Sequence, residues 1–157
     1  MEQTAVSYAG FWKRFVAALI DGFLLGIVNF IIFIPVIGLM GLGAVTDVGE
    51  NPEASAGLVA AAIGAYTLSF LAVGAAGWLY FTLMESSEKG ATLGKMALGI
   101  RVTDMNGNKI SFGRATGRYF GKIVSAMILY IGFIMAGFTQ QKQALHDIMA
   151  GCLVVNK

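Results

Sequence analysis

Hydrophobic positions along this chain gather in three long runs that contain no charged residue. The first covers Gly22–Thr46 and is extended upstream by Val16–Ile20, the second covers Ala54–Met84, and the third covers Ile123–Gln141. A helix needs about 20 apolar residues to cross a bilayer. The first two runs exceed that length, and the third is close to it. The pattern predicts two transmembrane helices and a third hydrophobic segment that either spans the membrane or is re-entrant.

Residues 99–112 show a different pattern, in which apolar and polar positions alternate on both sides of a turn signal. Ile100 and Val102 alternate with charged or polar neighbours, and Asn106-Gly107 follows them. An Asn-Gly pair between alternating segments is typical of a β-hairpin. Just upstream, apolar residues recur at helical spacing, which indicates a short interfacial helix. We therefore expect a small cytoplasmic hairpin preceded by an interfacial helix.

Two strands alone are marginally stable in water, so the hairpin needs a third partner. Cys152–Asn156 is rich in β-branched residues and is the natural candidate. If it pairs with the hairpin, the C-terminus is cytoplasmic and the third run must bend, for example near Gly132. If instead residues 120–138 span fully, the C-terminus lies outside. Lys142 and Lys157 favour the cytoplasmic, re-entrant alternative.

The predicted fold class is an all-α membrane protein with two transmembrane helices, a third spanning or re-entrant segment and a small cytoplasmic β-hairpin. We expect one domain over residues 1–157. Its predicted parts, in order, are a helix over about 11–40, an outer acidic loop 41–54, a helix over about 55–84, the cytoplasmic interfacial helix and hairpin 85–113, the third hydrophobic segment 114–139 and a C-terminal segment 140–157.

Composition supports a membrane location, and charge supplies an orientation. Of the residues, 57% are hydrophobic and 13% are charged, against roughly 25% charged in soluble domains. Lys and Arg gather before the first run and between residues 85 and 122, whereas the 41–54 loop carries only acidic charges. The positive-inside rule then places the N-terminus in the cytoplasm. We expect a multi-pass protein of the cell membrane, surrounded by lipid and without nucleic acid as a partner.

The reactive residues argue against an enzyme. The chain has one cysteine, Cys152, and one histidine, His146. A disulfide within the chain and a thiolate metal cluster are therefore excluded. A Ser/His/Asp or metal-ligand cluster is also missing from the sequence, so we expect neither catalysis nor a cofactor.

Asp21 is the most informative single residue, because it interrupts an otherwise apolar span. A charge at the centre of a membrane helix costs roughly 2.5–3.5 kcal/mol even on lenient scales. Three interpretations remain open. Asp21 holds helices together through a buried hydrogen bond or ion pair, it belongs to an ion or proton path, or it is protonated and faces a water-filled cavity.

Three segments together resemble the signatures of the RDD family of bacterial membrane proteins, which is named for one arginine and two aspartates. The signatures fall in order at Tyr8–Asp21, at Gly90–Val102, and at Arg118 with Gln143–Asp147 and Val154–Val155. The resemblance identifies Arg14, Asp21 and Asp147 as the three name-giving positions. It implies a bacterial inner-membrane protein whose molecular role is largely unassigned. Ligand transport has been suggested for the family, and some members are described as cation/proton antiporters.

The charged triad suggests specific pairings. Arg14 and Asp21 share a helix face but lie about 10 Å apart along the axis, too far for a direct salt bridge. Asp147 is therefore the expected partner of Arg14. The candidate partners of Asp21 are Arg118, Lys122, His146 or water in a cavity lined by Asn29 and Tyr66.

Four further residues are secondary site candidates, namely Lys95, Arg118, His146 and Asn29. His146 either titrates beside Asp147 or merely hydrogen-bonds backbone.

Three functional classes follow from these patterns. The first is a transporter component, such as a cation/proton exchanger built as a homo-oligomer, for which a monovalent cation or a proton is the partner. The second is an accessory or assembly factor that binds a membrane-protein partner through its cytoplasmic and C-terminal segments. The third, an enzyme acting on lipids, is disfavoured by the missing catalytic clusters.

Overall fold

The computed structural model describes residues 6–45 and 52–157, which form two compact units. Unit 1 contains the chain up to Gly22 and then Trp78–Lys157, and unit 2 contains Phe23–Gly77. Both long helices contribute to both units. The elements are, in order, α1 (Phe11–Val45), α2 (Pro52–Glu85), α3 (Leu93–Ala97), β1 (Ile100–Asp104), α4 (Phe112–Met127), α5 (Ile131–Ile134), the 3₁₀ helix η2 (Met135–Gly137), α6 (Leu145–Ala150) and β2 (Cys152–Asn156).

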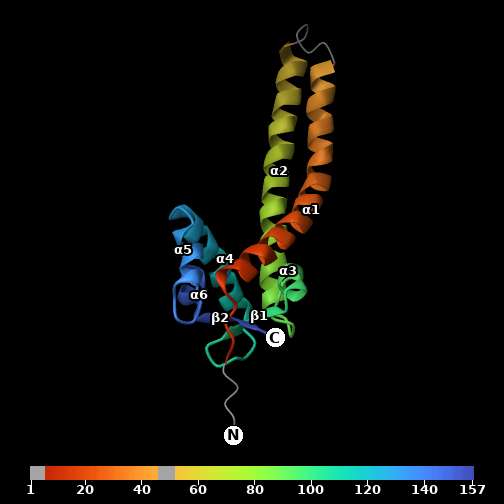
Figure 1. Cartoon of the computed structure of the whole chain (residues 1–157). Coiled ribbons are helices and arrows are strands. Elements are labelled where there is room, and N and C mark those ends of the chain that lie inside the picture. The colour runs from red at the N-terminus through yellow and green to blue at the C-terminus, as the bar shows by residue number, and fades with distance from the viewer. Residues whose placement is uncertain (1–5, 46–51) are drawn as a thin grey trace. The chain divides into compact units, whose positions relative to one another are not determined.

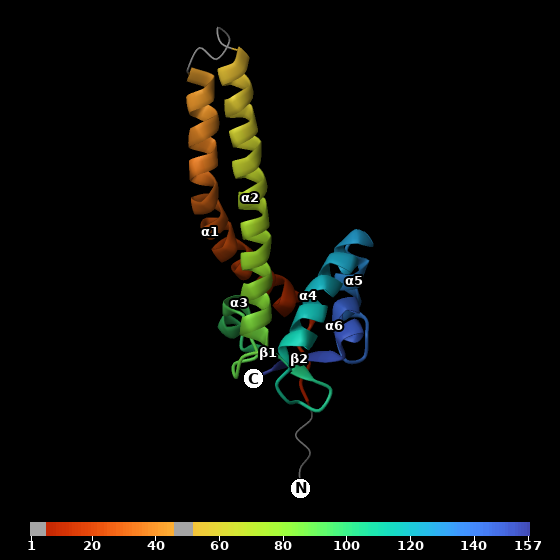
Figure 2. The ribbon, with the colours of Figure 1, turned by 180° about the vertical axis from the view of Figure 1, so that it is seen from behind.

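Unit 2 is a pair of helices that run side by side in both views (Figure 1, Figure 2). The rings of Phe33 on α1 and Tyr66 on α2 lie 5.9 Å apart. Most large apolar side chains of the pair are exposed, as expected for surfaces that face lipid. The stretches long and apolar enough to cross a membrane are Phe11–Gly38 and Ala56–Glu85, which confirms the two predicted transmembrane helices.

The helices extend beyond their predicted ends and shorten the acidic loop between them. α1 continues to Val45, and α2 begins at Pro52. Proline suits a first helical turn because its missing N–H would have no partner there. Asp47 and Glu50 of the predicted acidic loop lie outside the described residues.

Unit 1 is organised around a two-stranded antiparallel sheet. β1 pairs with β2 in a register that places Val102 opposite Val154. On the far side of β2, the Ala9 N–H donates to the Val154 carbonyl at 2.9 Å. On the far side of β1, the Val102 N–H donates to the Gly90 carbonyl at 2.7 Å. The C-terminal strand therefore lies inside the fold, with hydrogen-bonded backbone on both sides.

The sheet differs from the predicted hairpin in its second strand. The Asp104 carboxylate accepts the backbone N–H groups of Asn106 and Asn108 at 2.9 and 2.8 Å, which holds the chain in a turn. The Ser111 hydroxyl then accepts the Arg114 N–H and caps α4. Because the helix begins so soon after the turn, the returning strand has no room to form. The predicted third partner, β2, takes its place.

The third hydrophobic segment turns back on itself. α4 is followed by a bend of 117° before the α5–η2 stretch, at Leu129 and Tyr130, whose φ angles are +48° and +61°. The bend precedes the predicted position, Gly132, by two to three residues. Gly132 instead allows close packing, since a Cβ there would lie 2.7 Å from the Ser125 side chain. The chain then reaches β2, so both ends of the segment belong to unit 1, as the re-entrant alternative requires (Figure 2).

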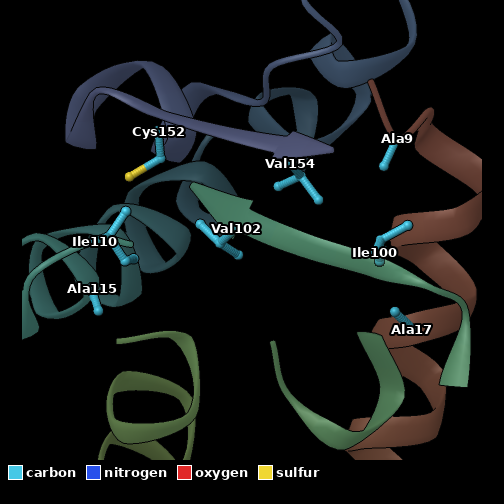
Figure 3. Packing of buried hydrophobic residues seen from close by; sticks show 8 residues of the cluster. All are labelled: Ala9, Ala17, Ile100, Val102, Ile110, Ala115, Cys152 and Val154. Atoms are coloured by element: carbon cyan, nitrogen blue, oxygen red, sulfur yellow. The ribbon is translucent and has the colours of Figure 1, made fainter. Parts of the chain in front are cut away.

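Small and β-branched residues fill the space around the two strands. Figure 3 shows eight buried residues of this core. They come from the N-terminal segment, α1, β1, the turn before α4, α4 itself and β2: Ala9, Ala17, Ile100, Val102, Ile110, Ala115, Cys152 and Val154. The core therefore fixes the first turns of α1 against the sheet, which positions the charged residues described next.

Candidate functional site

Arg14 and Asp147 form the ion pair predicted between the first helix and the C-terminal segment. Arg14 lies in the first turn of α1, where its Nε–H donates to the Ala9 carbonyl at 2.9 Å and its Nη1 donates to Asp147. The Asp147 carboxylate reaches back to accept the Ala144 N–H at 3.1 Å at the start of α6. Asp147 thus caps its own helix and binds α1 at once.

Arg118 on α4 joins this pair to the end of α2. Its Nε–H donates to Asp147 Oδ1 at 2.7 Å, and its Nη1 donates to Glu85 Oε2 at 2.6 Å. Arg118 is 2% exposed and both carboxylates are buried. Charges taken out of water are tolerated only when they are paired and hydrogen-bonded. Arg118 satisfies that condition for two carboxylates at the same time.

Glu85, at the end of α2, forms ion pairs with three cationic side chains. Its Oε1 accepts from Lys95 on α3 and lies 3.4 Å from Lys122 Nζ, while Oε2 accepts from Arg118. Sequence reasoning missed Glu85, because it ends a long uncharged run and looks like an interfacial residue. Its position as the first carboxylate of a strongly basic segment is the signal that could have found it. We call the whole set the charged network: Arg14, Glu85, Lys95, Arg118, Lys122 and Asp147.

Asp21 forms no hydrogen bond with the described members of the charged network. Its carboxylate accepts hydrogen bonds from three neutral donors instead. Its Oδ1 accepts from Tyr80 Oη and from the Gly94 N–H, both at 2.8 Å, and its Oδ2 accepts from Thr92 Oγ1 at 2.6 Å. Thr92 is the N-cap residue of α3, and Gly94 lies in its first turn, where backbone N–H groups lack partners within the helix. Asp21 therefore holds α3 against α1 and α2.

The cationic and histidine partners considered for Asp21 are replaced by these hydroxyl and backbone donors. The path of the chain after α2 explains this choice of partners. It brings residues 90–98 against α1 near Ala17 and Asp21. Gly94 makes this possible, since a Cβ there would lie 2.2 Å from the Ala17 carbonyl oxygen and 3.0 Å from the Asp21 carboxylate. Only glycine fits this approach of α3 to α1.

His146 packs between α4 and α5 next to the charged network. Its Nδ1 lies 3.3 Å from Ser125 Oγ, and its Nε2 lies 3.5 Å from Asp147 Oδ1. Burial, helped by the charge of Arg118, lowers the pKa of His146 to about 3. The imidazole is neutral at physiological pH and acts as a hydrogen-bonding group in the core. A close approach of α4 to α6 occurs at Gly121, where a Cβ would lie 3.1 Å from His146 Cβ.

The other pKa values near the site follow from burial and pairing. Burial lowers the pKa of Lys95 to about 7, although Glu85 acts in the opposite direction. Burial alone would raise the pKa of Asp147, but Arg118 and Arg14 hold it well below its usual range. Burial raises the pKa of the Cys152 thiol to about 11, so the thiol is protonated and unreactive.

Of the residues predicted for the site, unit 1 brings together Arg14, Asp147, Lys95, Arg118 and His146, and it also contains Asp21. The other two predicted residues, Asn29 and Tyr66, belong to unit 2. Within residues 6–45 and 52–157, the structure contains no group of three or more His, Cys, Asp or Glu side chains that could hold a metal ion.

A cavity of about 490 Å³ lies within unit 1 beside the charged network. Its lining includes four cationic side chains together with Asp21, and we call this charged part of the lining the floor: Arg14, Lys95, Arg118 and Lys122. The remaining lining residues are mainly apolar, and we call them the walls of the cavity; they include aromatic residues and Ile134 from α1, α2 and the third hydrophobic segment: Phe11, Phe15, Phe81, Tyr130, Phe133 and Ile134. The cavity therefore combines a cationic floor with apolar walls.

Known proteins match this chain over almost its whole length. The RDD family model matches residues 8–151. An uncharacterized protein of Bacillus subtilis (strain 168), YxaI, is 38% identical over 149 residues, which cover 95% of this chain and 97% of that protein. An uncharacterized membrane protein of the same organism, YteJ, is 30% identical over 157 residues, with 96% and 82% of the two chains covered. No solved structure matches the chain.

Proposed function

The chain belongs to the RDD family of membrane proteins, and we propose that it acts there as an accessory protein that associates with a transmembrane partner rather than as a cation/proton exchanger. The observation that carries this proposal is the saturation of its buried carboxylates. Asp21 accepts three hydrogen bonds, and Glu85 and Asp147 are each paired with two or more cations. The name-giving charges hold unit 1 together, and binding a cation would require breaking those bonds.

The same saturation bears on proton transfer. A proton on one oxygen of Asp21 would make that oxygen a donor, so the hydrogen bonds from Tyr80, Thr92 and Gly94 would have to rearrange. An unpaired buried donor costs about 1–3 kcal/mol. These three hydrogen bonds therefore support a role for Asp21 in holding α3 in place.

The surface that supports a transmembrane partner is a face of α2 made of small residues. Gly57, Ala60, Ala61 and Gly64 are all exposed and lie on one helix face, because the last three follow Gly57 by three, four and seven residues. A Cβ at Gly57 or Gly64 would have no heavy atom of the described chain within 4 Å. Glycine costs a helix about 1 kcal/mol relative to alanine, and small faces let membrane helices approach closely. We propose that a partner helix, from a second copy or from another membrane protein, packs here.

The proposal does not include partner binding through the C-terminal segment, which the sequence suggested. β2 is buried between β1 and the Tyr8–Ala9 segment, so its backbone is already hydrogen-bonded on both sides. The proposal retains the inner-membrane location with the N-terminus in the cytoplasm, which the positive-inside rule supports, and it assigns the protein no catalysis.

Cation/proton exchange is the second candidate, because Asp21 lines the cavity of unit 1. The two functions are distinguished by measuring cation-driven proton movement in liposomes that contain the purified protein. We expect wild type and Asp21→Asn to match empty liposomes. Exchange that is present in wild type and lost in an equally well folded Asp21→Asn protein would establish the exchanger instead.

Association is tested in the same membranes by energy transfer between labelled copies and by chemical cross-linking in native membranes. Gly64→Leu should abolish a specific contact, because the added side chain blocks close approach of the partner helix. Val59→Leu, on another exposed face of α2, is the matched control and should leave the contact unchanged. Equal association in wild type, Gly64→Leu and Val59→Leu would contradict the proposed surface.

A further inference from the structure

The cavity of unit 1 has a floor and walls of opposite character. We propose that it binds an amphiphile in which one anionic headgroup, a carboxylate or a phosphate, is attached to an aliphatic chain. The headgroup would lie on the cationic side chains of the charged network, and the chain would lie along the aromatic walls. This ligand class is independent of whether the protein associates with a partner helix.

Two cationic groups at the floor have donors left over after the internal pairs are made. Arg14 uses Nε and Nη1, but its Nη2 is buried and has no hydrogen-bond acceptor within the described parts of the chain. Buried polar groups without a partner are uncommon and each calls for an explanation. Arg14 lines the cavity, so a ligand oxygen could supply the missing acceptor after a small shift of the guanidinium.

Lys122 is the second such group. Its Nζ lies 3.4 Å from Glu85 Oε1, beyond the usual 2.7–3.2 Å range of an N–H···O hydrogen bond. The two oxygens of Glu85 are already bonded to Lys95 and Arg118. The Lys122 ammonium also lies 4.0 Å from the centre of the Phe81 ring. Lys122 therefore has donors that Glu85 does not use, and it lines the same cavity as Arg14.

Charge complementarity favours an anion over a cation. The four cations at the floor contact the carboxylates of Glu85 and Asp147, and Asp21 adds a third negative charge. The three carboxylates are hydrogen-bonded within the protein, whereas the spare donors belong to cations. A ligand that accepts hydrogen bonds and carries negative charge fits this floor.

The walls indicate that the ligand has an aliphatic part. The cavity volume of about 490 Å³ lies within the range of about 300–1,000 Å³ found for small-molecule sites. A second cavity of about 400 Å³ shares Phe11 and Ile134 with the first and continues to Trp12 and Phe138. Inorganic phosphate alone would leave these apolar surfaces uncovered, whereas a hydrocarbon chain would fill them.

The test uses the purified full chain in nonionic detergent, with binding followed by thermal stabilisation and by native mass spectrometry. Dodecyl phosphate and dodecanoate are compared with dodecylphosphocholine, which has the same chain length but a zwitterionic headgroup, and with inorganic phosphate. We expect the two anionic amphiphiles to bind at least about tenfold more tightly than the zwitterion, as the gain of one charge-assisted hydrogen bond implies. Lys122→Gln should lose about that factor, whereas Lys109→Gln, a surface lysine paired with Glu88, should not.

The outcomes separate the possible sources of the ligand. Tight binding of the single-chain anions supports a free amphiphile. Retention of phosphatidylglycerol over phosphatidylcholine with the same acyl chains, in nanodiscs, supports a lipid of the bilayer, and both results support the anionic amphiphile. Equal binding of zwitterion and anions, equally tight binding of inorganic phosphate, or identical affinities of Lys122→Gln and Lys109→Gln would overturn the proposal. The headgroup comparison in the wild-type protein decides the question even if Lys122→Gln fails to fold.

Discussion

At the residue scale, Arg118 is the side chain on which the buried charges of unit 1 depend. It bridges Asp147 and Glu85 and so connects α4 to both α6 and α2. Removal of one partner from a buried ion pair costs more than the pair contributes, because the remaining charge stays buried without compensation. The charged network should therefore respond strongly to neutralisation of a single member.

Asp147→Asn tests this dependence. The substitution leaves Arg14 and Arg118 without their shared carboxylate, and we expect the free energy of unfolding to fall by about 3–5 kcal/mol. Titration with SDS in mixed micelles measures the change. Glu88→Gln, which affects an exposed ion pair with Lys109, is the control and should show no measurable change. An Asp147→Asn protein as stable as the control would contradict the structural role of the network.

The Arg14–Asp147 pair also carries a prediction about charge exchange. In the double variant Arg14→Asp, Asp147→Arg, the new guanidinium would lie beside Arg118, which normally bonds Asp147 Oδ1 at 2.7 Å. We therefore expect the double variant to recover only part of the stability lost in each single reversal, as measured by the same SDS titration. Full recovery would show that Arg118 does not depend on Asp147.

His146 predicts a dependence of stability on pH. Its pKa is about 3 in the folded protein and near 6.5 when unfolded. Between these values the unfolded state binds a proton and the folded state does not, so acidification favours unfolding. The free energy of unfolding should fall by up to about 1.4 kcal/mol per pH unit below pH 6.5. Unfolding titrations from pH 7.5 to 5 measure this slope, which His146→Asn should flatten; an unchanged slope would assign it to another group.

At the element scale, the short helix α3 is held in place by one carboxylate and one glycine. Asp21 accepts hydrogen bonds from the N-cap residue Thr92 and from Gly94 in the first turn. Glycine at position 94 lets the backbone of α3 approach α1 closely. A helix of five residues has little stability of its own. Its position therefore depends on these contacts.

Gly94→Ala should displace α3, because the added Cβ would lie 2.2 Å from the Ala17 carbonyl oxygen. We expect a loss of several kcal/mol in the free energy of unfolding, comparable to overpacking a core. Gly113→Ala is a matched control within α4, where nothing lies within 4 Å of the new Cβ, and it should be neutral or stabilising by up to about 1 kcal/mol. Equal stabilities of the two variants would contradict the docking of α3 on α1.

At the scale of the whole molecule, the two ends of the chain meet in one unit. Tyr8 forms an isolated bridge with Val155, and the Asn156 side chain donates to Ser7 Oγ at 2.8 Å. We therefore expect both termini to lie on the same side of the membrane. The same contact favours the re-entrant alternative for the third segment, since a full crossing would separate the two termini.

Reporter fusions test this topology. We expect a reporter that is active only in the cytoplasm to be active at the N-terminus and after Lys157, and a reporter that is active only outside to be inactive at both. A fusion placed after Gly49, between the two long helices, should show the opposite result and serves as the control. Opposite results at the two termini would mean that the third segment crosses the membrane.

The sequence by itself determined the features that depend on local pattern. The uncharged runs predict two membrane helices, because the required length is set by the thickness of the bilayer. The pairing of Arg14 with Asp147 was also predictable, since Arg14 lies too far from Asp21 along the helix and needs another partner near the same interface. The β-branched residues of the C-terminal segment likewise indicated β2 as a partner strand.

Tertiary structure alone decided which distant residues surround each buried group. Asp21 is satisfied by hydroxyl and backbone donors from residues 80–94, a choice that depends on the path of the chain after α2. Glu85 becomes a centre of the charged network because α3 and α4 bring cations to it. The turn at Asp104 and the bend at Leu129 similarly decide the strand partner and the re-entrant path. The sequence shows which polar groups will be buried and will therefore need hydrogen-bond partners. Only the folded structure decides which residues lie close enough to be those partners.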